Sequence, residues 1–154
     1  MNNYFWNSLI SGPGVTIFVL CLYLIQVQTG SDSLWEGVLE DLNQIEKTEM
    51  DVFLYTADAK FPANCSIRVK KCFVEEMKVI VYESQLENNN KVHGTMSRII
   101  RIVMEDLEAR QNTEISQCQK CETFEEKNYG EFMESFRKNV QRWHREDTEA
   151  KRGF

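Results

Sequence analysis

The sequence predicts an all-α fold, a four-helix bundle, for the charged part of this chain. Four segments repeat apolar residues at spacings of three and four, which is the period of a helix with one buried face. The chain has 154 residues, of which 42% are hydrophobic, so it can bury one core and has no signature of disorder. Because four amphipathic helices can bury their faces against one another, a bundle is the natural architecture.

An apolar leader precedes this charged part. Residues 1–31 contain no Asp, Glu, Lys or Arg, and residues 15–25 form an uninterrupted apolar run. That run is too short to span a membrane and has the length of the core of a signal peptide. The small residues 29–31 follow it, so we expect a signal peptide at 1–31, cleaved after residue 30 or 31. A retained membrane anchor is disfavoured because residues 12–14, Gly-Pro-Gly, interrupt its extension towards the N-terminus.

Charge and cysteine content narrow the function classes. The net charge of −6 argues against a nucleic-acid partner. Removal of the leader leaves a secreted, extracellular chain with no segment expected to insert into a membrane. Export would also remove Cys21, leaving four cysteines in an oxidising compartment, which predicts two disulfides. Spacing alone does not choose among their three possible connectivities.

The first helix is expected to begin near Ser33 and Glu36, which match a Ser-x-x-Glu capping box. Its apolar face consists of Trp35, Val38, Leu42 and Ile45. Asp41 lies at the edge of this face instead of opposite it. An acid in that position is either capped locally or available to a partner.

Three further helices follow a connection at 51–64, which contains the strand-like stretch 52–56. Periodicity predicts them at about 66–86, 92–110 and 118–144. Their apolar faces consist of Val69, Phe73, Met77 and Ile80 in the second helix, of Val92, Met96, Ile99, Ile100, Val103 and Leu107 in the third, and of Cys121, Phe124, Phe132, Phe136, Val140 and Trp143 in the fourth.

The connections limit the topology and the domain. The connection at 51–64 is long enough for the first two helices to run parallel, and the turn at 87–91 makes the second and third antiparallel. Residues 111–117 are a polar linker. We therefore expect one bundle domain at 32–144, followed by a charged, frayed tail at 145–154.

The residues give little support to catalysis. The seven glycines form no phosphate-binding loop, and no nucleophile has a plausible base, so neither an enzyme nor a cofactor is expected. Cys118-x-x-Cys121 could be the redox pair of a secreted thiol-disulfide protein, but it lacks a strand-to-helix context. Together with Cys65 and Cys72 it could bind zinc, although the spacing is poor. Structural disulfides are the favoured interpretation, with no metal.

Acidic residues gather beside these cysteines. Glu76 and Glu83 follow Cys72 at helical spacing. Glu122, Glu125 and Glu126 flank Cys121. They form either a solvated face or a rigid acidic patch for a basic partner. In addition, Asn64 begins an Asn-Cys-Ser glycosylation sequon.

Three tracts resemble the interleukin-2/interleukin-15 family of short-chain four-helix cytokines. They are Leu-Tyr-Thr at 54–56, the Cys-x6-Cys-Phe spacing at 65–73, and CETFEEKNYGEFMESFRKNVQ at 121–141. The similarity extends from about residue 35 to 143. It implies an up-up-down-down bundle with disulfides Cys65–Cys118 and Cys72–Cys121. It also implies a monomeric ligand that assembles receptor chains and promotes proliferation and survival of T and natural killer lymphocytes.

The resemblance also implies roles for single residues. An alpha receptor with a small sushi domain would bind Tyr55, Glu76, Glu83 and Glu122. The shared beta receptor would contact Asp41, and the common gamma chain would contact Gln141.

This chain departs from the family pattern on the third helix. It has Gly94 and Arg98 where mammalian members carry an Asp and an Asn that also contact the beta chain, and Arg101 replaces an apolar residue. These differences leave open the interleukin-15-like paralogue or an interleukin-2 relative, although a two-disulfide framework disfavours interleukin-2.

Overall fold

A computed structural model describes residues 34–110 and 117–153. The predicted signal peptide at 1–31 lies outside the described residues, as do Ser33 of the capping box and all but the last residue of the linker 111–117. The four cysteines that were expected to pair lie within the two described ranges.

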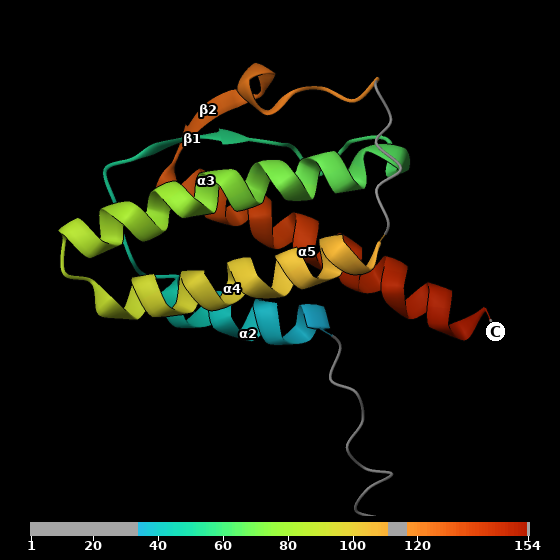
Figure 1. The fold of residues 1–154 in the computed structure, drawn as a ribbon, viewed down its shortest axis with the longest axis horizontal. Helices are drawn as coiled ribbons and strands as arrows, with labels where there is room; N and C mark the ends of the chain where they lie inside the picture. The colour runs from blue at the N-terminus through green and yellow to red at the C-terminus, as the bar shows by residue number, and fades with distance from the viewer. Residues whose placement is uncertain (1–33, 111–116, 154) are drawn as a thin grey trace, which may run out of the picture. The chain divides into compact units, whose positions relative to one another are not determined.

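Four α-helices form the bundle: α2 (Leu34–Ile45), α3 (Ser66–Leu86), α4 (Asn90–Ala109) and α5 (Tyr129–Arg152). In Figure 1, α2 and α3 run in one direction, and α4 and α5 run in the opposite direction. The up-up-down-down four-helix fold is therefore confirmed. The end of α3 and the start of α4 are joined by a short turn that contains Asn88, whose φ of 55° is left-handed.

The apolar faces predicted from periodicity meet in the core. The whole predicted face of α2 is buried, and the aromatic rings of α3 and α5 pack beside it. Trp35 and Trp143 have ring centroids 5.1 Å apart, and Phe73 lies 5.1 Å from Phe136 and 5.4 Å from Phe132. These tilted aromatic contacts connect α2 and α3 to α5.

Two short strands join the long connections of the bundle. β1 (Phe53–Thr56) pairs antiparallel with β2 (Glu125–Asn128), so that Tyr55 is opposite Glu126. Side chains alternate along β1, because Leu54 is buried and Phe53 is exposed. The strand-like stretch predicted at 52–56 is thus a strand, whereas β2 was not expected.

The fourth helix begins later than the sequence suggested. The prediction of a helix from residue 118 is wrong, because residues 121–123 form a 3₁₀ turn and 125–128 form β2. The Asn128 side chain accepts a hydrogen bond from the Glu131 backbone N–H (3.0 Å) and donates one to its carboxylate (2.7 Å), which fixes the start of α5. Cys121 and Phe124 therefore lie before the helix.

The charged tail is also helical up to Arg152, and not frayed as expected. Two contacts of Asp147 connect it to the bundle: Trp35 Nε1 donates to one carboxylate oxygen (2.9 Å), and Arg110 donates to the other (2.6 Å). Lys151 and Arg152 lie in the last turn, where positive charge is favourable.

A buried lysine lies beneath these contacts. Lys70 is 1% exposed; its Nζ is 2.6 Å from the Asp106 carboxylate and lies 4.6 Å from the ring centroid of Trp35 and 4.9 Å from that of Trp143. Asp106 also accepts a hydrogen bond from Arg110 (2.9 Å). We call Lys70, Asp106, Arg110 and Asp147 the internal ion network, because its charges neutralise one another across three helices.

Candidate functional site

Two disulfides attach the second long connection to the start of α3. Cys65 is bonded to Cys118 and Cys72 to Cys121, with Cα–Cα distances of 5.5 and 5.3 Å. This is the connectivity that the family resemblance implies. Cys118 and Cys121 each have a different partner, so they do not form a disulfide within C-x-x-C. Within the described residues, no group of three or more potential ligands is placed to bind a metal ion.

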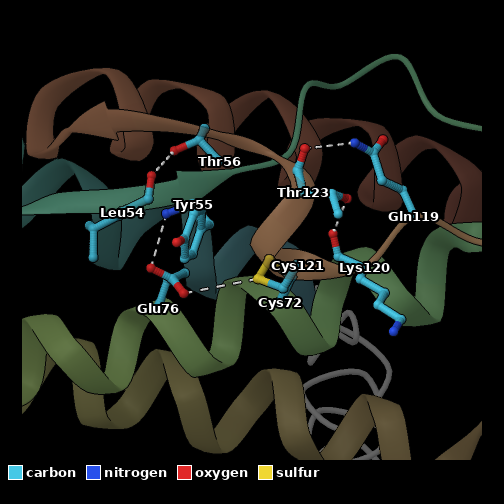
Figure 2. The surroundings of a disulfide bond; sticks show 9 residues. All are labelled: Leu54, Tyr55, Thr56, Cys72, Glu76, Gln119, Lys120, Cys121 and Thr123. Carbon is cyan, nitrogen blue, oxygen red and sulfur yellow. Dashed lines mark hydrogen bonds between the residues drawn. A yellow bond between two sulfur atoms is a disulfide. The ribbon is translucent and has the colours of Figure 1, made fainter.

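Glu76 lies between a disulfide and strand β1 (Figure 2). One of its carboxylate oxygens accepts a hydrogen bond from the backbone N–H of Tyr55 (3.0 Å). The other oxygen is 3.9 Å from Cys121 Sγ. A disulfide sulfur has no proton to donate, so this second approach is a packing contact. The carboxylate of Glu76 is thus held half-buried in one position.

The charges around Glu76 are negative. Burial is the main cause that raises the pKa of Glu76 above its ordinary value, and the charges of Glu126, Glu122 and Glu75 raise it further, while the Tyr55 N–H opposes them. No cation is among these strongest influences. In Figure 2 the side chain of Lys120, a basic residue of the same connection, extends away from Glu76.

Tyr55 responds to the same charges. Hydrogen bonding with the carboxylate of Glu126, which lies opposite on β2, is the largest cause that raises the pKa of Tyr55. The charge of Glu126 follows, and smaller effects include the charges of Glu76 and Glu122. We call Tyr55, Glu76, Glu122 and Glu126 the acidic surface. Three of these four were predicted as candidates, and the structure brings them together. Glu126 was expected among the acids beside the disulfides but was assigned no contact, because its position opposite Tyr55 exists only once β2 has formed.

Glu83 extends this surface along α3. It lies two helical turns beyond Glu76 on the same side, and its side chain is half-exposed. Val79, between them, is 40% exposed. Glu83 is not among the charges that act most strongly on Tyr55 or Glu76, so it forms the edge of the surface.

Asp41 has its partner within the chain, on another helix, which is neither a local cap nor an acid left free for a receptor. It is buried, and both of its carboxylate oxygens accept hydrogen bonds from Arg98 of α4. The Arg98 Nε is 2.7 Å from Oδ2, and its Nη2 contacts Oδ1. The departure from the family pattern at residue 98 therefore acts directly on the predicted beta-chain contact.

The remaining candidates are separate from the acidic surface. Gln141 is exposed on α5, whereas its neighbour Val140 is buried, so Gln141 faces outward as a contact residue must. Asn64 is exposed in the 3₁₀ turn Ala63–Cys65. The residue in the middle of its sequon, Cys65, is buried in a disulfide.

These features together define a class of protein. An up-up-down-down bundle whose two long connections pair as a short sheet, clamped by two disulfides, is a short-chain four-helix cytokine. No helix in residues 34–110 and 117–153 has the length and apolar character needed to cross a membrane.

Comparison with known proteins gives the family. The model of the Interleukin 15 family matches residues 15–144. Interleukin-15 from Cavia porcellus is 35% identical over 135 residues, which cover 84% of this chain and 80% of that protein. Interleukin-15 from Felis catus is 36% identical over 69% of this chain and 65% of its own length, and that from Homo sapiens is 30% identical over 88% and 81%. The chain belongs to the interleukin-15 family, a family of cytokines and not of enzymes.

Proposed function

We propose that this chain is a secreted cytokine that binds an alpha receptor and then assembles the shared beta and common gamma receptor chains. The result would be proliferation and survival of T and natural killer lymphocytes. Membership of the interleukin-15 family supports the class of partner. The observation that carries the proposal is the half-buried Glu76 carboxylate, which is held among other carboxylates.

The acidic surface suits a basic partner for a physical reason. Burying Glu76 near the charges of Glu122 and Glu126 disfavours its ionised form, so the chain bears a cost that a bound cation would remove. A fixed array of negative charge also accelerates encounter with a positive surface. Because the disulfide Cys72–Cys121 and the Tyr55 N–H hold Glu76 in place, little ordering is needed on binding.

Each receptor chain is assigned its own residues. The alpha receptor binds Tyr55, Glu76 and Glu122, with Glu83 at the edge. The beta chain contacts the α2–α4 face around Asp41, and the gamma chain contacts Gln141 on α5. The free cytokine is a monomer.

The proposal also covers processing. The signal peptide at 1–31 is removed, which leaves the bundle domain at 32–144 and its tail at 145–154 as the mature protein. Asn64 is a possible glycan acceptor. Because the next residue, Cys65, forms a disulfide with Cys118, a glycan must be attached either before this disulfide forms or next to it once it has formed.

The test is binding of the protein, expressed with its own leader in animal cells, to an immobilised alpha-receptor sushi domain of the same species. Measurements at low and physiological salt are compared. We expect tight binding that weakens with salt, because exposed charges are screened over about 10 Å at 0.1 M. A correctly oxidised, helical protein that does not bind would contradict the alpha-receptor assignment. It would favour the interleukin-15-like paralogue, an interleukin-2 relative or a different receptor.

A free-thiol titration of the same sample separates this function from the alternative of a thiol-disulfide protein that uses Cys118 and Cys121. Structural disulfides leave no reactive thiol, whereas a redox site cycles. We expect no thiol to titrate in the native mature protein.

A further inference from the structure

On the α2–α4 face, Asp41 is paired with Arg98, and the exposed member of this pair is the arginine. The Asp41 side chain is only 9% exposed, and the Arg98 side chain is 47% exposed. The hydrogen bonds come from Nε and Nη2 of Arg98 and reach both oxygens of Asp41. A bidentate, charge-assisted pair of this kind fixes the plane of the guanidinium.

A partner approaching this face therefore meets a cation first. To reach Asp41, a basic side chain would have to displace Arg98 and overcome the repulsion between the two positive charges. The Nη1 group of Arg98 is not used in the pair with Asp41, so its two N–H groups are left to donate hydrogen bonds to another acceptor. The half-exposed guanidinium is thus the donor group of this face, and each oxygen of the buried Asp41 already accepts one hydrogen bond from it.

The surroundings leave room for a partner at this position. Gly94 lies one turn before Arg98 on α4, and Gly37 lies one turn before Asp41 on α2. A Cβ atom added at either glycine would have no neighbour within 4 Å. The next arginine on α4, Arg101, is paired with Glu105 of the same helix (3.3 Å), so its charge is already partly balanced.

We infer that the signalling receptor chain which binds the α2–α4 face places a carboxylate on Arg98, and that Asp41 is the positioning residue that holds this arginine. The inference rests on the proposed function, because it assumes a receptor at this face. It reverses the chemistry expected there: the determinant of receptor specificity is a cation of this chain and an acid of the receptor. A receptor whose contact residue is basic would be rejected.

The experiment measures binding of the full chain to the beta-chain ectodomain of the same species, with alpha-domain binding and circular dichroism as controls for folding. Arg98→Gln should weaken beta binding roughly tenfold or more, since an interfacial charge pair is lost. Asp41→Asn should weaken it only about threefold, because Arg98 keeps its charge but loses one anchor. Arg101→Gln is the matched control and should change the affinity by less than about twofold.

Three results would overturn the inference. They are an Arg98→Gln variant that binds as well as the wild type or better, an Asp41→Asn variant that loses more affinity than Arg98→Gln, and equal losses in Arg98→Gln and Arg101→Gln. The first two would make Asp41 the contact, and the third would reduce the effect to overall charge. A wild-type chain that binds the alpha domain but no beta ectodomain would instead refute the proposed receptor assembly, and this inference with it.

Discussion

The internal ion network and the acidic surface differ in how their partly or fully buried charges are compensated. In the internal ion network, Lys70 lies against Asp106, and Arg110 bridges Asp106 to Asp147. At the acidic surface, the strongest charges acting on Glu76 are other carboxylates. The charges of the first arrangement are paired within the chain, although burial still lowers the pKa of Lys70. The second arrangement leaves like charges together, an electrostatic cost that a basic partner can remove. This contrast identifies which acids serve the fold and which are available for binding.

Asp41 lies between these two extremes. Its carboxylate is compensated within the chain, as in the internal ion network, but the compensating Arg98 is half-exposed. Asp41 can therefore be retained in the sequence while the arginine at residue 98, which lies beside it in the fold, changes the charge that a receptor would contact.

The largest expected effect comes from breaking the internal ion network. Asp106→Asn removes the negative partner of Lys70 and leaves a buried cation uncompensated. We expect a loss of about 3–5 kcal/mol in the free energy of unfolding, measured in urea. Glu75→Gln is the control, because it breaks the exposed pair with Lys78 and should cost less than about 0.5 kcal/mol. Similar losses in the two variants would mean that Lys70 does not depend on Asp106.

Reversing a charge on the acidic surface should affect binding and not folding. Glu76→Lys is expected to weaken alpha-domain binding by about a hundredfold, the size of a strong interface residue, with the helical content unchanged. Glu105→Lys makes the same change of net charge on α4 and should leave the alpha affinity within about threefold. An unchanged alpha affinity in Glu76→Lys would refute its assignment.

Substitutions on the proposed signalling faces should reduce signalling without reducing alpha-domain binding. Gln141→Ala is expected to reduce signalling in a cell-proliferation assay by roughly tenfold, while alpha binding persists. Asp41→Ala should have a smaller effect of the same kind, because Asp41 acts through Arg98. Lys138→Ala, an exposed change on the same helix as Gln141, is the control. Loss of alpha binding together with signalling would indicate misfolding instead of a lost contact.

A smaller effect is expected from pH. The pKa of Glu76 is raised above its ordinary value, so as the pH falls below 7 this residue takes up a proton before an ordinary carboxyl does. The neutral form cannot attract a basic partner, and alpha binding should therefore weaken by a few-fold as this proton is taken up. Glu76→Gln should lose affinity at pH 7 and show a shallower pH dependence. An equally steep profile in the variant would assign the titration to another group.

Much of the fold follows from the sequence because burial imposes a helical period. The face of α2 and the core of α4 were predicted in this way, and the buried Lys70 could have been found by the same rule. It shares one side of α3 with Phe73, Val74 and Met77, which are all buried. A lysine at that position needs a buried acid, which the sequence alone does not place.

The start of α5 shows where periodicity misleads. Cys121 and Phe124 fit the helical spacing of the fourth segment, but the first is bonded to α3 and the residues after Phe124 pair with β1. The signal for the true boundary was Asn128 followed by Glu131, a capping pair. The strand Glu125–Asn128 is polar and mostly exposed, so no alternation of apolar residues marks it.

Only part of the candidate site could be predicted, because local patterns give the residues of one helix face but not the contacts between elements. Helical spacing placed Glu76 and Glu83 on one side of α3, and Glu122 was found beside Cys121. The family resemblance supplied Tyr55. The hydrogen bond from the Tyr55 N–H to Glu76 forms because β1, in the connection between α2 and α3, lies against α3. No local sequence pattern encodes this contact.

We propose that Glu76 is held for a partner at a cost to the stability of the free chain. Urea unfolding of the wild type and Glu76→Gln at pH 7, each with and without excess alpha domain, tests this most directly. The uncharged amide can still accept the Tyr55 hydrogen bond, so the free variant should be as stable as the wild type or more stable. Added alpha domain should stabilise the wild type more than the variant. A variant that is less stable when free, and equally stabilised by the alpha domain, would contradict the account.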